Sequence, residues 1–142
     1  DGDPDIDAVC RISNLKPVRK FTKINPYSSN KFMPFNSQNT FLSPFAVKDY
    51  MMFPHVGRMD DIWGGYYLQK KIKKPFIVFS NSSVVQKRND HNFAIDLKNE
   101  IVGYLDTLKF INDISNKILP IKTKKALEVY LSITNKIYKS NY

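Results

Sequence analysis

Cysteine is almost absent from this 142-residue sequence, which contains only Cys10. A single thiol excludes an internal disulfide and a cysteine-rich metal site. Cys10 falls in the first stretch with helical spacing, so we expect it to be a small buried side chain there. Its presence is compatible with secreted and cytosolic locations alike.

Long apolar runs are also missing. No segment approaches the roughly 18 to 20 consecutive apolar residues that a membrane-spanning helix needs, so we predict no membrane span in this chain. Hydrophobic residues nevertheless make up 42% of the sequence and aromatic residues 13%. This composition argues against disorder and is sufficient for one domain with a core of its own.

Arginine is scarce, although the net charge is +9. Only four of the 22 basic residues are arginines, whereas recognition of bases and phosphates relies on the bidentate guanidinium group. Zinc-finger, basic-zipper and RNA-recognition signatures are not found. We therefore expect a lysine-coated surface and no specific nucleic-acid partner. A basic nucleic-acid binder remains the third class of function.

The spacing of apolar residues and the placement of proline and glycine predict an α/β chain, for which we expect a short mixed sheet and a C-terminal pair of helices. In the first part of the chain we expect a helix over 5–15 capped by Asp5 or Asp7, a short strand over 18–24, a strand that passes into a short helix at 44–50, and a buried extended segment over 50–54. A helix that starts near Asp60 and ends by Pro75 should follow, and after it a buried strand over 75–79 and a polar loop over 80–92. Two helices, over 93–118 and 122–139, are expected to close the chain. We expect residues 1–118 to form one domain. Residues 119–142 are expected to add a basic amphipathic helix that packs on this domain. The lysines of this helix are either solvated or face an acidic partner.

The stretch VGRMDDIWGGYYLQ, residues 56–69, does not look designed for packing alone. It places Arg58, two aspartates and the only tryptophan within six residues, and two glycines follow. Each glycine inside a helix costs up to ~1 kcal/mol relative to alanine. These glycines would let a ligand or another backbone segment come close to the helix.

Asp60 and Asp61 are placed at the N-terminus of the predicted helix, where the helix dipole stabilises negative charge. A carboxylate held ionised there is a candidate general base, or a group that orients a hydroxyl. Arg58 would pair with an aspartate or with an anionic ligand such as a phosphate. Trp63 offers a flat apolar face for a sugar ring. In the structural alternative, Asp60 only caps the helix and Asp61 decorates its first turn.

Four motifs follow one another in an order that resembles a known family: GDPDIDAVCR, MPFNSQNTFL, FPHVGRMDDIWGGYYLQ and QKRNDHNFAIDLKNE. Over residues 2–104 the chain resembles the distal half of nucleotide-sugar glycosyltransferase-like proteins, namely the STELLO-type proteins and, more distantly, the reversibly glycosylated polypeptides (UDP-arabinopyranose mutases). The resemblance implies a GT-A-like fold, a nucleotide-sugar donor, a hydroxyl acceptor and a divalent cation, Mn²⁺ or Mg²⁺. Cytoplasmic and Golgi-lumenal locations both stay open.

The resemblance also implies roles for individual residues. Asp60 and Asp61 are similar to the catalytic carboxylates on the acceptor side, within a motif whose substrate-binding part includes Gly57, Arg58 and Trp63. The residues that match the family's other substrate-binding positions are Asn36, Gln38 and Asn39, as a polar strand that faces the sugar, and Arg88, as a diphosphate ligand or a solvated side chain.

The metal ligand that the resemblance implies in this chain is His91, and His55 is its rival. An imidazole is acceptable to Mn²⁺, although oxygen ligands suit that ion better.

One departure from the family concerns the donor side. In the family an upstream α/β half ending in a D-x-D strand holds the nucleotide and most of the metal's ligands, whereas DGDPDID at residues 1–7 resembles a later loop. We therefore expect this chain to be part of a longer protein, with the upstream polypeptide half as its partner. The alternative is a non-catalytic interaction module that has kept the fold and lost the donor site.

Overall fold

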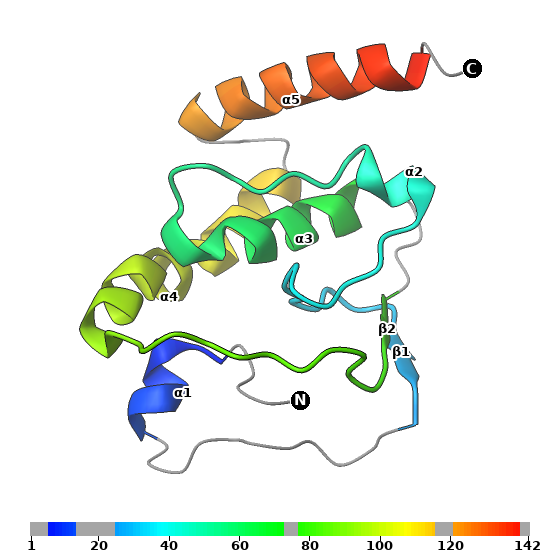
Figure 1. The fold of residues 1–142 in the computed structure, drawn as a ribbon. Coiled ribbons are helices and arrows are strands. Elements are labelled where there is room, and N and C mark those ends of the chain that lie inside the picture. Colours follow the sequence, from blue (N-terminus) through cyan, green and yellow to red (C-terminus); the bar gives the residue numbers. More distant parts are fainter. Residues whose placement is uncertain (1–5, 14–24, 73–76, 116–120, 140–142) are drawn as a thin grey trace.

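The computed structural model describes residues 6–13, 25–72, 77–115 and 121–139 (Figure 1). Within them the fold is mixed α/β and mostly helical. The elements in chain order are helix α1 (Ala8–Ser13), strand β1 (Tyr27–Ser29), helix α2 (Pro44–Val47), the 3-10 helix η1 (Gly57–Met59), helix α3 (Asp60–Lys71), strand β2 (Ile77–Phe79), helix α4 (Phe93–Ser115) and helix α5 (Ile121–Lys139).

The sheet in the described part of the chain consists of β1 and β2, which pair in antiparallel register, so among these residues the sheet is antiparallel and not mixed as expected. Tyr27 lies opposite Phe79, and their rings stack with centroids 5.1 Å apart. Of the strand predicted at 75–79, residues 77–79 form β2, whereas residues 75 and 76 lie outside the described residues. The prediction that this strand is buried is wrong for β2, because Val78 is 53% exposed and its two neighbours in the strand are only partly buried. The strand predicted over 18–24 lies outside the described residues.

Helix α3 begins at Asp60, as predicted, and ends at Lys71 with aspartates in its first turn and lysines in its last. The chain enters it through Gly57, whose φ of 59° lies in the left-handed region. A Cβ atom at this position would overlap the carbonyl oxygen of Asn99 on α4. Glycine therefore serves both the turn and the close approach of η1 to α4.

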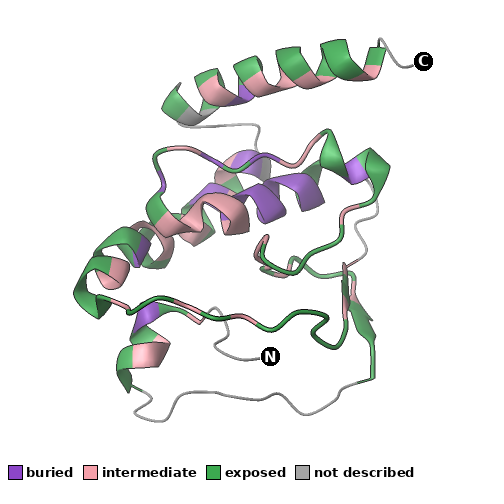
Figure 2. Cartoon of the chain, viewed as in Figure 1, coloured by how far each residue is buried: buried purple, intermediate pink, exposed green. Residues whose placement is uncertain are grey.

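The core lies between α3, the second half of α4 and the extended segment 51–56. Figure 2 shows that buried residues concentrate along α3, and residues 63–69 are buried throughout. A Cβ atom at Gly64 would overlap the carbonyl oxygen of Met51, so one of the two helix glycines admits a neighbouring backbone, as expected. The buried cluster comprises Met51, Phe53, Val56, Trp63, Tyr66, Tyr67, Phe110, Ile114 and Leu127.

Helices α4 and α5 are the two closing helices predicted from the sequence. Leu127 brings α5 into the same core cluster. The Tyr130 hydroxyl donates to the carbonyl oxygens of Tyr50, at 2.6 Å, and Val47, at 3.1 Å. In the part of the chain that the structure describes, no helix combines the length and the apolar character needed to cross a membrane.

Candidate functional site

An open cavity of about 1520 Å³ lies beside α3. Its walls come from the start of α1, residues 34–43, η1, α3, β2 and α4. The charged side chains that line it are Asp7, Arg58 and Glu100. Helices α1 and η1 each contact α4. Arg58 binds Glu100, and the Tyr104 hydroxyl lies within hydrogen-bond distance of both Glu100 and Asp7, so these three side chains lie together at one end of the cavity.

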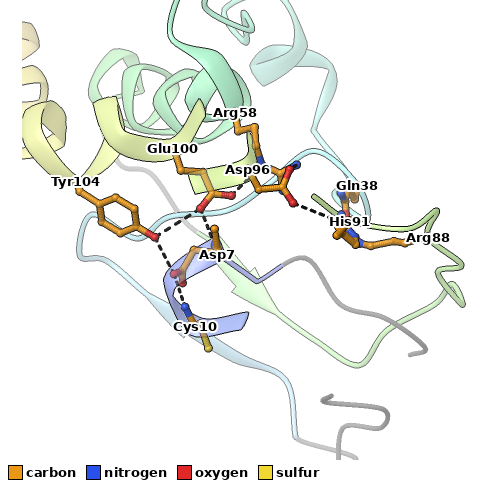
Figure 3. Close-up of polar contacts among 10 residues, drawn as sticks. Asp7, Cys10, Gln38, Arg58, Arg88, His91, Asp96, Glu100 and Tyr104 are labelled. Atoms are coloured by element: carbon orange, nitrogen blue, oxygen red, sulfur yellow. Dashed lines mark hydrogen bonds and ion pairs between the residues drawn. The ribbon is translucent and has the colours of Figure 1, made fainter. Parts of the chain in front are cut away.

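Glu100 is the central residue of that charged end, and its side chain is only 8% exposed. Its Oε1 atom accepts a hydrogen bond from Nε of Arg58 at 2.8 Å, and its Oε2 atom accepts one from the backbone N–H of Ala8 at 2.6 Å (Figure 3). One buried carboxylate therefore joins η1 and the first turn of α1 to α4.

Asp96 extends the network one turn earlier along α4. Its Oδ1 atom lies 3.3 Å from Nη1 of Arg58, so this arginine is held by two carboxylates. Its Oδ2 atom lies 2.9 Å from Nδ1 of His91. The end of the polar loop 80–92 is thus fixed to the same face of α4 as η1.

Asp7 and Tyr104 form the exposed edge of the network. The Tyr104 hydroxyl donates to Oδ1 of Asp7 at 2.8 Å, and the N–H of Cys10 donates to the same oxygen at 2.9 Å, so Asp7 is the N-cap of α1. Burial would raise the pKa of Asp7, but these hydrogen bonds outweigh it and lower the pKa below the usual value. Burial and the bond to Asp7 raise the pKa of Tyr104 to about 12. At neutral pH the carboxylate is therefore ionised and the phenol protonated.

Asp60 and Asp61 do not line the cavity, and their carboxylates accept hydrogen bonds from backbone N–H groups. The Oδ2 atom of Asp61 accepts hydrogen bonds from the N–H of Ser37 at 2.7 Å and from its hydroxyl at 3.0 Å. The Oδ1 atom of Asp60 accepts one from the N–H of Asp61 at 2.8 Å. Asp61 thereby fixes the turn at 36–40 to the start of α3. These contacts correspond to the structural alternative for the two aspartates.

Trp63 lies in the core and not on the surface. It is 4% exposed, its ring stacks on Phe110 with centroids 4.2 Å apart, and its Nε1–H donates to the Thr107 hydroxyl at 3.0 Å. Because the ring is buried, it does not offer the open flat face that was expected to contact a sugar. Phe41, by contrast, is 92% exposed and lines the cavity.

Asn36, Gln38 and Asn39 lie in and beside a turn, whereas a strand was predicted. Oδ1 of Asn36 accepts from the N–H of Gln38 at 3.3 Å, which closes the turn locally. The 80–92 loop is bound to it, since Ser83 donates to Oδ1 of Asn39 at 2.8 Å and Nη2 of Arg88 donates to Oε1 of Gln38 at 3.1 Å. Asn36 and Asn39 line the cavity, and Arg88 holds the loop beside it.

The two histidines occupy different environments. His91 lies against Asp96, and this pair supplies two groups that are able to bind a metal. His55 is exposed in the turn before η1, with a φ of 73°. In the described ranges, His, Cys, Asp and Glu form no group of three or more that could hold a metal ion.

The sequence itself contains a signal for this network. Asp96, Glu100 and Tyr104 are spaced four residues apart, and this spacing places them on one face of a helix. Such a stripe of polar side chains marks a helix face that contacts other polar groups. For Asp7 the residue pattern alone predicts a helix cap, and its contact with Tyr104 follows only from the structure.

Comparisons of this chain with protein-family models, with curated proteins and with solved structures find no match. The geometry nonetheless unites the four motifs quoted above. The first binds the fourth through Ala8 and Glu100, and the third binds the fourth through Arg58. The second binds the third through Ser37 and Asp61. Segments far apart in the sequence thus meet around one cavity.

Proposed function

We propose that this chain is the acceptor-side part of a GT-A-like glycosyltransferase, which transfers a sugar from a nucleotide-sugar donor to a hydroxyl group. The observation that carries the proposal is the meeting of the four motifs around the cavity. Each motif is hydrogen-bonded to at least one other, through Glu100, Arg58, Asp61 and Gln38. Residues that only stabilised separate elements would not need to converge in this way.

Asp7 is the group that we assign to the acceptor. It is exposed, it lines the cavity and it is ionised at neutral pH, so it accepts a hydrogen bond from an incoming hydroxyl and orients the oxygen. The acceptor oxygen then bonds to the anomeric carbon, the bond from that carbon to the diphosphate breaks, and the hydroxyl proton passes to the carboxylate. Asp60, Asp61 and Arg58 position the loops around the site.

The donor side of the reaction belongs to the upstream polypeptide half that the family resemblance implies. The nucleotide and the divalent cation would be held mainly there, and the neighbouring His91 and Asp96 are the pair of ligands that this chain would add. Titration calorimetry of this chain with UDP-sugars and Mn²⁺ is therefore expected to detect little or no binding. Tight metal-dependent binding would move the donor site into these residues.

The direct test uses the intact polypeptide that contains this chain, incubated with nucleotide sugars, Mn²⁺ and hydroxyl acceptors. Product masses are expected to show transfer of one sugar. Asp7→Asn should lower the rate about 100-fold, the scale of losing a positioned acid–base group. Asp106→Asn is the matched control, because Asp106 is exposed on α4 and does not line the cavity. Full activity of the Asp7 variant, or no transfer from any nucleotide sugar, contradicts the proposal.

A non-catalytic interaction module is the second candidate, and one surface favours it. Ile101, Leu105 and Leu108 on α4 are 50%, 74% and 84% exposed and follow helical spacing. An apolar stripe of this kind marks a surface that contacts another protein. This candidate predicts that the intact polypeptide transfers no sugar, while Leu108→Ser weakens its association with a partner and Asp7→Asn does not.

A further inference from the structure

The cavity is elongated, because residues from both ends of α3 line it. Met59 and Ile62 lie at the start of the helix, and Leu68 and Ile72 lie at its end. At 1.5 Å of rise per residue, the distance from Met59 to Ile72 is about 20 Å. A ligand that filled the cavity would therefore reach from α1 and α4 to β2, which lie on opposite sides of the fold (Figure 1).

The two ends of the cavity differ in chemistry. The three charged side chains and the Tyr104 hydroxyl all lie at the α1–α4 end. At the other end, the lining side chains from α3 and β2 are mainly apolar, and they include Leu68, Ile72, Ile77 and Phe79. The polar lining residues at this end, Ser80, Asn81 and Ser83, belong to the loop that follows β2.

Gln69 does not change the apolar character of the second end, although it lines the cavity. Its Nε2 atom donates to the carbonyl oxygens of Met33, at 2.8 Å, and Gly65, at 3.0 Å. Its Oε1 atom accepts from the N–H of Met33 at 3.0 Å. Both donor hydrogens of the amide and one acceptor site are therefore in use within the fold.

We infer that the acceptor is amphipathic, with a hydroxyl-bearing head against Asp7 and Tyr104 and an apolar tail along Leu68, Ile72 and Ile77. This inference rests on the proposed function. A free oligosaccharide that filled the cavity would place hydroxyl groups against Leu68, Ile72 and Ile77, whose side chains offer no hydrogen bond in exchange for the water that is displaced. A hydrocarbon tail gains free energy from the same contacts.

The test measures binding of methyl, hexyl and octyl β-glucoside to this chain by NMR titration, below the critical micelle concentrations of the detergents. The dissociation constant is expected to fall about four-fold for each methylene group that enters the cavity. Octyl glucoside should shift the amide signals of both Tyr104 and Ile72, and methyl glucoside only those near Tyr104. Equal affinity for the three compounds, no binding, or shifts confined to residues outside the cavity would overturn the inference.

Two variants make the test specific. Ile72→Ser and Ile77→Ser, which alter partly buried cavity residues, should each weaken octyl glucoside binding several-fold and leave methyl glucoside binding unchanged. Ile133→Ser is the control, because this residue is 52% exposed on α5 and does not line the cavity. A fold check by circular dichroism accompanies each variant, and retained methyl glucoside binding shows that the polar end is intact. Equal losses in the control and the cavity variants would count against the inference.

Failure of this inference and failure of the proposed function give different results. If the intact polypeptide transfers sugar to methyl and octyl glucoside at equal kcat/KM, the glycosyltransferase proposal stands and the amphipathic acceptor is wrong. If octyl glucoside binds along the cavity and no nucleotide sugar is consumed, the amphiphile site stands and the transfer reaction is wrong.

Discussion

The two sides of α3 are held by different forces. On the packed side, which comprises segment 51–56, the second half of α4 and α5, aromatic and aliphatic side chains form one buried cluster. On the cavity side, which comprises α1, β1, β2 and the loops 30–43 and 80–92, most residues are exposed (Figure 2). There the elements are attached to α3 and α4 by a few polar anchors, chiefly Gln69, Asp61 and Glu100, and by the stacking of Phe32 on Tyr66.

The difference explains where polar residues are buried in this chain. Gln69 and Glu100 are 3% and 6% exposed, and each binds backbone groups of a cavity-side segment. Such anchors fix position without burying much apolar area. We therefore expect the cavity side to open locally at a lower free energy than the packed side, as binding regions commonly do.

The largest expected effect comes from removing a side chain of the packed side. Phe53 is fully buried and makes edge-on contacts with the rings of Tyr67 and Phe110. Phe53→Ala should lower the free energy of unfolding by ~3–5 kcal/mol, measured by urea denaturation. Phe45→Ala is the control, because Phe45 is 83% exposed. Similar losses in both variants would show that the packed side is not the core of stability.

Removing an anchor of the cavity side should have a smaller and more local effect. Glu100→Ala leaves the N–H of Ala8 and Nε of Arg58 without their acceptor, at a cost of about 1–3 kcal/mol. Hydrogen exchange should accelerate in α1 and η1 well before it does in α3. Glu100→Gln keeps one acceptor oxygen and should fall between the wild type and the alanine variant. Uniform acceleration across the chain would remove the distinction between the two sides.

Alkaline pH should lower the stability of the fold through Tyr50, which lies where the two sides of α3 meet. Burial, followed by the charges of Asp61 and Asp60, raises the pKa of Tyr50 from 10.0 to about 12. Because the folded pKa is above the unfolded value, this contribution is fully present below pH 10 and is lost as the pH rises towards 12. The melting temperature of the wild type should therefore fall more steeply over this range than that of Tyr50→Phe. Parallel curves for the two proteins would contradict the assignment.

The smallest expected effects distinguish the neighbouring aspartates. Asp61→Asn keeps one acceptor oxygen for Ser37 and loses its charge, so a loss of about 0.5–1.5 kcal/mol is expected. Asp60→Asn should cost ~0.3–1 kcal/mol or less, since only the interaction with the helix dipole weakens. NMR shifts in the turn 36–40 should follow the first variant and not the second. The reverse order would make Asp60 the anchor of that turn.

The helices were predictable because their determinants are local. The apolar periodicity of residues 93–118 and 122–139 predicted α4 and α5, and the acidic first turn predicted the start of α3 at Asp60. The four motifs that carry the family resemblance also lie together in the structure. Which side chains within them face the cavity was not predictable, since neighbours such as Asp60, Asp61 and Trp63 differ in burial and partners.

The sequence by itself determined which segments become helical and which residues are available for polar contacts, because these properties depend on neighbours within a few positions. Only the tertiary structure decided that Trp63 is buried and that Glu100 joins two distant segments. The carboxylate of Glu100 and the N–H of Ala8 that it binds are 92 positions apart along the chain. A contact at that separation depends on how α1, η1 and α4 pack together, and no local pattern encodes that arrangement.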